Sequence, residues 1–180
     1  MSKKVIILST SPRRGGNSEA LADAFLAGAA GAGHTVEKIC LYDKDIRFCR
    51  GCLACQKTMR CVIHDDVEAI LDKMRRADVV VFATPIYFYE MSGQMKTLLD
   101  RTNPLFPAAY DFRDVYLLAT AADGEESAMD GAEQGLAGWI SCFDQAKLRG
   151  VLRGVDVDSP GAIQDRPALL EQAARMGAGV

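Results

Sequence analysis

The chain has 180 residues, of which 49% are hydrophobic and 25% are charged, and its formal net charge is −3. This length suits one domain with a substantial core, and we expect a single domain over residues 1–180. The basic residues are scattered along the chain, which argues against a nucleic-acid partner. The first apolar run is too short for a signal peptide or a membrane span, so we expect no membrane association and a cytoplasmic protein.

Strand and helix signals alternate along the whole chain. The predicted strands are Val5 to Ser9, Thr35 to Leu41, Asp78 to Thr84, Val115 to Thr120 and Val151 to Val157. The predicted helices begin at Ser18 and then cover Asp66 to Arg76, Ser92 to Arg101, Ala128 to Leu148 and Pro167 to Met176. Strict alternation predicts an α/β fold with a doubly wound parallel sheet of five strands and helices on both faces. The economical strand order for such a sheet is 2-1-3-4-5.

The first predicted strand runs into a turn rich in hydroxyl groups and glycine, with two arginines, before a helix begins. Unpaired N–H groups and the positive end of the helix dipole favour a phosphate at such a place. The turn lacks the Gly-Lys-Ser/Thr ending of a triphosphate loop and the G-x-G-x-x-G of a dinucleotide fold. An ordinary polar turn without a ligand is the alternative. The candidate phosphate-binding residues are Ser9, Ser11, Pro12, Arg13, Gly16, Asn17 and Ser18, and Asn17 or Ser18 is the expected helix N-cap.

The third predicted strand is followed by Thr84-Pro85-Ile86-Tyr87-Phe88-Tyr89. Proline is expected to end the strand, because it cannot donate a ladder hydrogen bond. The aromatic side chains could pack on a planar ring or fill a subunit interface. In the order 2-1-3-4-5, the turns after strands one and three meet at the switch point of the sheet. We therefore expect Pro85 to Phe88 to lie beside the phosphate turn.

Four cysteines, Cys49, Cys52, Cys55 and Cys61, lie in one loop at about residues 47–63. These cysteines are not expected to form stable disulfides in a reducing compartment. Zinc commonly uses two separated pairs of ligands, whereas a compact C-x-x-C-x-x-C run is closer to the pattern of cluster-binding ferredoxins. An iron-sulfur cluster, a zinc ion and metal-free thiols all remain open at this point.

These motifs together resemble a known family. Ser11 to Ser18 is similar to the phosphate loop of flavodoxin-like FMN reductases and iron-sulfur flavoproteins, although Thr10 stands where those relatives often carry glycine. Pro85 to Phe88, followed by Ser92-Gly93 and Asp100-Arg101, resembles a second block of the same reductases, and the cysteine spacing resembles the iron-sulfur flavoproteins. The resemblance implies a flavodoxin-like fold with the FMN phosphate on the first loop. It places the flavin ring on Pro85, Ile86, Tyr87 and Phe88, with a third contact loop at Thr120 to Gly124, in which Ala121, Asp123 and Gly124 are the candidate contacts.

The function implied by this resemblance is that of an FMN-dependent oxidoreductase. It would take electrons from NAD(P)H and pass them to a flavin, quinone or protein acceptor, with a 4Fe–4S cluster on the four cysteines as an optional relay. No side chain is expected to act as an acid or base, because the flavin carries the chemistry. A homodimer or homotetramer is also implied.

Two other functions stay open at this stage. One is a flavodoxin-type electron carrier that exchanges electrons with ferredoxin-like partners, and the other is a thiol or metal sensor on the same scaffold. A carrier would be expected to have a strongly acidic docking surface, whereas this chain is only mildly acidic, which favours the enzyme.

Overall fold

Five parallel strands form the centre of the computed structural model, which describes residues 1–180. Their order is β2-β1-β3-β5-β6, and a short strand β4 pairs antiparallel with the end of β3. Because β4 lies off the main path, this order is the predicted 2-1-3-4-5 and confirms the flavodoxin-like fold. The bounds are β1 Lys4–Ser9, β2 Thr35–Cys40, β3 Val79–Tyr87, β4 Glu90–Met91, β5 Asp114–Thr120 and β6 Lys147–Gly154.

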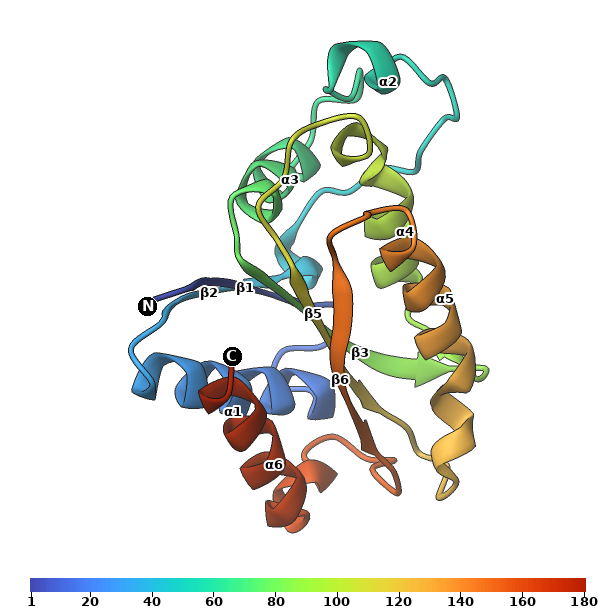
Figure 1. Ribbon diagram of the computed structural model, residues 1–180. Helices are drawn as coiled ribbons and strands as arrows, with labels where there is room; N and C mark the ends of the chain where they lie inside the picture. The colour runs from blue at the N-terminus through green and yellow to red at the C-terminus, as the bar shows by residue number, and fades with distance from the viewer.

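Helices cover both faces of this sheet, as Figure 1 shows. One face carries α1 Asn17–Gly31 and α6 Pro167–Ala178, and the other carries α3 Val67–Arg75, α4 Gly93–Arg101 and α5 Asp130–Ile140. The short helix α2, Cys55–Thr58, lies in the cysteine loop at the top of the view. Single turns of 3-10 helix occupy Leu41–Asp43, Asn103–Leu105, Glu126–Met129 and Ala162–Asp165. No helix is both long and apolar enough to cross a bilayer.

The central strands bury their side chains on both faces, as continuous apolar runs predict. Val79 to Ala83 in β3 are all fully buried, and so are Ile7 and Leu8 in β1. Alternate residues of β1 and β3 join the two hydrophobic cores on opposite faces of the sheet. The carboxyl ends of β1 and β3 are thereby held side by side, with Ser9 opposite Ala83.

α1 and α6 pack so closely that two positions accept only glycine. A Cβ on Gly28 would lie 1.9 Å from the backbone oxygen of Ala174, and a Cβ on Gly177 would lie 2.0 Å from the backbone oxygen of Phe25. Both distances are far below van der Waals contact. This pair of glycines therefore sets the separation of the two helices.

Three sequence predictions about element boundaries are wrong. The helix predicted to run to Leu148 ends at Ile140, and the last strand covers Lys147–Gly154 instead of Val151 to Val157. Pro85 does not end β3, which continues to Tyr87. Just beyond the end of β1, Thr10 N–H donates to the Ala83 oxygen, so the backbone groups of Ala83 face β1. Backbone groups two residues apart in a strand face the same side, so the nitrogen of Pro85 also faces this side, past the last residue of β1. No ladder bond is lost there, which is why proline is tolerated.

Candidate functional site

A pocket lies at the carboxyl edge of the sheet, where the turn after β1 meets the end of β3. The phosphate turn lines it with six of its seven predicted residues, and the end of β3 lines it with three of the four residues predicted there. These lining residues are Ser11, Pro12, Arg13, Gly16, Asn17, Ser18, Pro85, Ile86 and Tyr87. Two further lining residues, Thr120 and Ala122, belong to the third predicted loop, whereas Val157 and Asp158 were not predicted from the sequence. The predicted juxtaposition of the two loops is therefore present.

Two buried hydroxyl groups at the two ends of the phosphate turn have no hydrogen-bond partner. They belong to Ser9, at the end of β1 and outside the pocket lining, and to Ser18, which lines the pocket from the first turn of α1, and neither residue is more than 1% exposed. A buried polar group without a partner costs about 1–3 kcal/mol, so native proteins rarely leave one unsatisfied. The N–H groups at the start of α1 point to the same place. This donor set fits a phosphate group.

Gly16 keeps the turn close-packed. A Cβ at this position would lie 2.5 Å from Ser11 Oγ, which itself accepts a hydrogen bond from Arg13 N–H and donates to the Arg13 oxygen. Arg13 lines the pocket and makes no ion pair, whereas Arg14 pairs with Asp43 at 2.8 Å. One arginine of the two is therefore available to an anion in the pocket.

The expected N-cap role of Asn17 or Ser18 is wrong, because Gly16 is the N-cap residue and offers no side-chain cap. The Asn17 side chain is instead hydrogen-bonded to the loop after β6. Its Nδ2 donates to the oxygens of Val157 and Ser159 at 3.0 and 2.9 Å, and its Oδ1 accepts from the N–H groups of Gly161 and Ile163. Asn17 therefore joins the phosphate turn to the loop that supplies Val157 and Asp158.

A buried carboxylate supports the turn from behind. Glu19 accepts the Gly15 N–H at 2.8 Å and a hydrogen bond from Lys38 Nζ in β2 at 3.0 Å, and the Cys40 thiol lies 3.2 Å away. Burial raises the pKa of Glu19, but the hydrogen bonds from Lys38, Cys40 and Gly15 outweigh it, so the pKa lies below the ordinary value. Lys38 compensates the negative charge that Glu19 places near an anion site.

Thr10 fastens the turn to α4. It is fully buried, its Oγ1 donates to the Ala83 oxygen at 2.9 Å, and Ser92 Oγ lies 3.0 Å from that hydroxyl. Ser92 is the N-cap of α4 and accepts the Met95 N–H. The departure from glycine at position 10 therefore adds an anchor, and the turn keeps its place beside β3.

The loop after β3 is a two-residue hairpin turn into β4. Its central residues, Phe88 and Tyr89, both have positive φ, +50° and +63°. Such a turn ordinarily contains Asn and Gly, because other L-residues are strained in this conformation. Phe88 is 99% exposed and does not line the pocket, while Tyr89 Oη lies 3.3 Å from Asp123 Oδ2.

The predicted loop after β5, Thr120 to Gly124, lines the pocket with two of its residues, but not with the three candidate contacts. Thr120 and Ala122 line the pocket, whereas Ala121 is buried in the core. Asp123 contacts Tyr89, and Gly124 packs against Asp156, whose Oδ1 would lie 2.8 Å from an added Cβ.

The four cysteines of the predicted metal loop line one small cavity, together with Ile63 and Asn103. Burial raises the pKa of the Cys55 thiol, and the charges of Cys61, Cys52 and Cys49 raise it further. Backbone N–H groups reach two of the sulfurs, Gly51 to Cys49 at 3.4 Å and Ile63 to Cys61 at 3.5 Å. No group of three or more His, Cys, Asp or Glu side chains is arranged to hold a metal ion.

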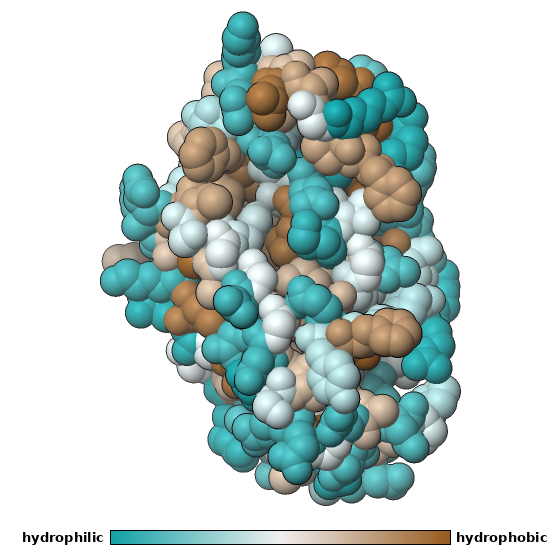
Figure 2. Space-filling view, turned by 90° about the vertical axis from the view of Figure 1, so that its right-hand side faces the viewer, coloured by the Kyte–Doolittle hydropathy of each residue, from teal (hydrophilic) through white to brown (hydrophobic).

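Apolar side chains surround the cysteine loop. Figure 2 shows hydrophobic residues exposed at the top of the molecule, the end that carries α2 in Figure 1. The exposed residues of this region are Phe48, Leu53, Met59, Val62 and Phe106. Leu53 and Met59 also have positive φ, so this backbone is held in a conformation that the free chain would disfavour.

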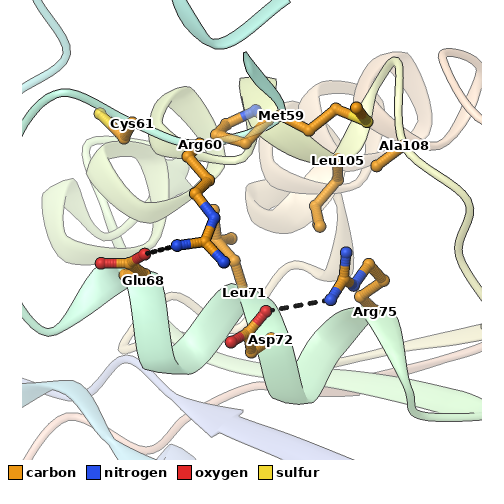
Figure 3. A pocket seen from close by; sticks show the side chains of 10 residues that line it. Met59, Arg60, Cys61, Glu68, Leu71, Asp72, Arg75, Leu105 and Ala108 are labelled. Atoms are coloured by element: carbon orange, nitrogen blue, oxygen red, sulfur yellow. Dashed lines mark hydrogen bonds and ion pairs between the residues drawn. The ribbon is translucent and has the colours of Figure 1, made fainter.

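A second cavity lies between the cysteine loop and α3 (Figure 3). Two arginines reach into it, and each is paired with a carboxylate of α3: Arg60 with Glu68 at 3.6 Å, and Arg75 with Asp72 at 3.2 Å. Because both charges are already compensated, we assign no ligand to this cavity.

Comparisons with known proteins agree with this geometry. An iron-sulfur flavoprotein of Methanocaldococcus jannaschii is 43% identical over 102 residues, which cover 57% of this chain and 53% of that protein. An iron-sulfur flavoprotein of Archaeoglobus fulgidus is 35% identical over 101 residues, or 56% and 46% of the two chains. The match thus spans about half the length of these curated relatives.

Solved structures show the same fold over the whole chain. The NAD(P)H:quinone oxidoreductase of Methanothermobacter marburgensis has a TM-score of 0.72 at 22% identity and covers 99% of this chain and 97% of its own. The azoreductase of Bacillus anthracis has a TM-score of 0.74 at 20% identity and covers both chains fully. The model of the NADPH-dependent FMN reductase family matches residues 3–151, and the chain therefore belongs to that family.

Proposed function

We propose that this chain binds FMN in the pocket between the phosphate turn and the end of β3, and that it works as an NAD(P)H-dependent oxidoreductase. The observation that carries the proposal is the pair of buried hydroxyl groups without partners, Ser9 and Ser18, beside the N-terminus of α1. Membership of the FMN reductase family supports the choice of phosphate ligand.

Each part of the pocket would have its own role. The hydroxyls of Ser9 and Ser18, the N–H groups at the start of α1 and the Arg13 guanidinium would hold the phosphate. Pro85, Ile86 and Tyr87 would form the wall for the ring system and keep water from it. When bound, FMN supplies the hydride acceptance and the one-electron chemistry that no side chain can provide.

FMN titration of the S18A variant tests the binding site. Removing one donor to a charged phosphate should weaken FMN binding roughly 10- to 100-fold, measured by quenching of flavin fluorescence. Ser141→Ala, at an exposed position after α5, is the matched control and should leave the affinity unchanged. Equal affinity of S18A and the parent protein would contradict the phosphate site.

Anaerobic mixing with NADH or NADPH tests the enzyme against the carrier. Bleaching of the flavin absorbance by either nucleotide supports the oxidoreductase. Reduction by ferredoxin alone would instead identify an electron carrier. The acceptor in the proposed reaction is a flavin, a quinone or a protein, and the rate of reoxidation by each class would rank them.

We further propose that the cysteine loop holds a 4Fe–4S cluster. Four thiols around one cavity, with backbone N–H groups on two of the sulfurs, are a donor set that suits such a cluster, in which each cysteine binds a different iron. Iron and sulfide assays with a visible spectrum on anaerobically purified protein test this. The C52S/C55S double variant should lose iron and keep its FMN affinity, whereas loss of FMN binding would favour a sensor whose two sites are one unit.

The apolar surface supports a homodimer or homotetramer as the working form. Phe88 on the hairpin and the hydrophobic residues around the cysteine loop are exposed in the single chain. Sedimentation equilibrium should give a mass that is a multiple of 19.5 kDa, and a monomer at all concentrations would contradict this.

A further inference from the structure

Arg101, the last residue of α4, is a charged side chain that is completely buried. Its guanidinium forms a two-pronged pair with Asp65, Nη1 to Oδ2 at 2.7 Å and Nη2 to Oδ1 at 3.0 Å. The Asp65 side chain is also fully buried. A buried pair of this kind is not a sign of stability by itself, because taking two charges out of water costs as much as their attraction returns. Its geometry indicates what else the pair does.

The same two side chains hold both ends of the cysteine loop. At the incoming end, Arg101 Nη1 donates to the backbone oxygen of Arg47, and the Arg47 N–H donates to Asp65 at 3.0 Å. At the outgoing end, Arg101 Nη2 donates to the Ile63 oxygen at 3.3 Å, and Asp65 accepts the Val67 N–H at 3.2 Å. All four cysteines lie between these two ends. Arg101 and Asp65 therefore form a clasp that closes the loop.

One donor of Arg101 is left over. Its Nε is buried and has no hydrogen-bond partner, although the other two nitrogens are bound. Cys61 is two residues before Ile63, whose oxygen is already bound by the same guanidinium. Burial lowers the pKa of Arg101, but Asp65 and Cys61 raise it above its ordinary value. An unpaired, buried N–H of a cation is a donor that suits an anionic acceptor such as a thiolate.

We propose that Arg101 is the positioning residue of the cysteine loop, which it closes at both ends from α4, and that its Nε–H is reserved for the sulfur of Cys61 as a deprotonated ligand. The clasp stands on the contacts above, whereas the role of Nε rests on the proposed cluster. A hydrogen bond to a ligand sulfur raises the reduction potential of an iron-sulfur cluster. Arg101 would thus both shape the loop and tune the potential of the group that the loop holds.

The R101K variant tests both parts. Lysine keeps the positive charge, but its single ammonium group cannot bind both carboxylate oxygens of Asp65 and two backbone oxygens at once. It also has no N–H group at the position of Arg101 Nε. The control is K96M, which removes an exposed ion pair with Asp100 from the same helix. Hydrogen exchange of metal-free, FMN-loaded protein is measured at the Arg47 and Val67 amides, with Val81 in the centre of β3 as the internal reference. After reconstitution with iron and sulfide, redox titration gives the midpoint potentials of cluster and flavin.

In R101K we expect the Arg47 and Val67 amides to exchange at least roughly tenfold faster, with Val81 unchanged. The cluster potential should fall while the flavin potential stays the same, and K96M should match the parent protein in every readout. Unchanged exchange at Arg47 and Val67 would overturn the clasp. Faster exchange with an unchanged cluster potential would overturn the assignment of Nε to Cys61.

A second variant keeps the test decisive if R101K fails to fold. D65N preserves the shape of the carboxylate and leaves Arg101 in place, and it should speed exchange of the same two amides, while unchanged exchange would overturn the clasp. If the parent protein binds FMN but takes up no iron, the cluster part of the proposed function fails, and with it the role of Nε. The hydrogen-exchange data on metal-free protein would still show whether Arg101 and Asp65 hold the two ends of the cysteine loop.

Discussion

Ser92 Oγ lies 3.0 Å from Thr10 Oγ1 and 3.2 Å from the Thr10 backbone oxygen, so the start of α4 is bound to the phosphate turn. The same hydroxyl caps α4 by accepting the Met95 N–H. One serine therefore serves a helix and a ligand loop at once, and both residues are buried.

The S92A variant should lose about 1–3 kcal/mol of unfolding free energy, because it removes a helix cap and leaves a buried hydroxyl of Thr10 with one partner fewer. Urea unfolding of the FMN-free protein measures this. Ser127→Ala, at an exposed serine, should change the stability by less than about 0.5 kcal/mol. A cost for S92A as small as that of the control would show that Ser92 does not anchor the turn.

Substitution of neighbouring glycines should separate the shape of the phosphate turn from its backbone strain. G16A places a Cβ 2.5 Å from Ser11 Oγ and must displace that side chain, so FMN affinity should fall at least roughly tenfold. G15A adds a Cβ with nothing within 4 Å but at a φ of +62°, which should cost about 1–2 kcal/mol of stability. Fluorescence titration and urea unfolding of both variants test this, and equal FMN affinities for the two would contradict it.

Acid should weaken the protein partly through Glu19. Because the folded state holds the pKa of Glu19 below its ordinary value, its stabilising effect is complete above the unfolded pKa and is lost as pH falls through the folded one. The parent protein should therefore exceed E19Q in stability at neutral pH, and the difference should shrink below roughly pH 4.3. Urea unfolding over a pH series measures the difference. A gap that is constant with pH would mean that the charge of Glu19 contributes nothing.

Substitutions in the hairpin turn after β3 should raise the stability of the protein. The F88N/Y89G variant installs the residue pair that this turn geometry favours, and it should gain about 1–2 kcal/mol because two strained side chains are removed. Thermal or urea unfolding checks the gain. Y89F removes only the hydroxyl near Asp123 and is the control for that contact. A loss of stability in F88N/Y89G would show that the aromatic side chains stabilise the hairpin.

Two glycines of α1 should respond in opposite directions to alanine. G28A drives a Cβ into the Ala174 oxygen of α6 and should cost at least about 1–3 kcal/mol, because the helices must move apart. G31A meets nothing within 4 Å and should gain up to about 1 kcal/mol from helix propensity. Urea unfolding of both variants tests the closeness of α1 and α6. Similar effects of the two substitutions would rule out a packing origin.

The sheet and the meeting of its ligand loops were predictable from the sequence, because buried parallel strands leave continuous apolar runs such as Val79 to Ala83. The end of α5 was not. Phe143 follows Trp139 and Ile140 at helical spacing, yet it packs on Tyr110, Phe112 and Trp139 from a turn. The apolar spacing therefore reflects tertiary contacts of Phe143, although a longer helix would produce the same pattern in the sequence.

The residues that support the site were harder to find than those that line it. Asp65 looks like an ordinary capping acid before α3, and nothing in the sequence pairs it with Arg101 in α4. Likewise, Asn17 has the composition of a helix cap but binds the loop after β6. Such pairings join distant segments, and local patterns of residues do not contain them.

The length of α4 is constrained by what its two ends hold. Ser92 binds the phosphate turn at one end, and Arg101 binds the cysteine loop at the other. Each residue turns an α-helix by about 100° and lengthens it by about 1.5 Å, so a single insertion would rotate Arg101 away from Asp65 while Ser92 stayed in place. Substitutions on the exposed side of α4 can therefore be tolerated, whereas any change in its residue count would detach one of the two loops.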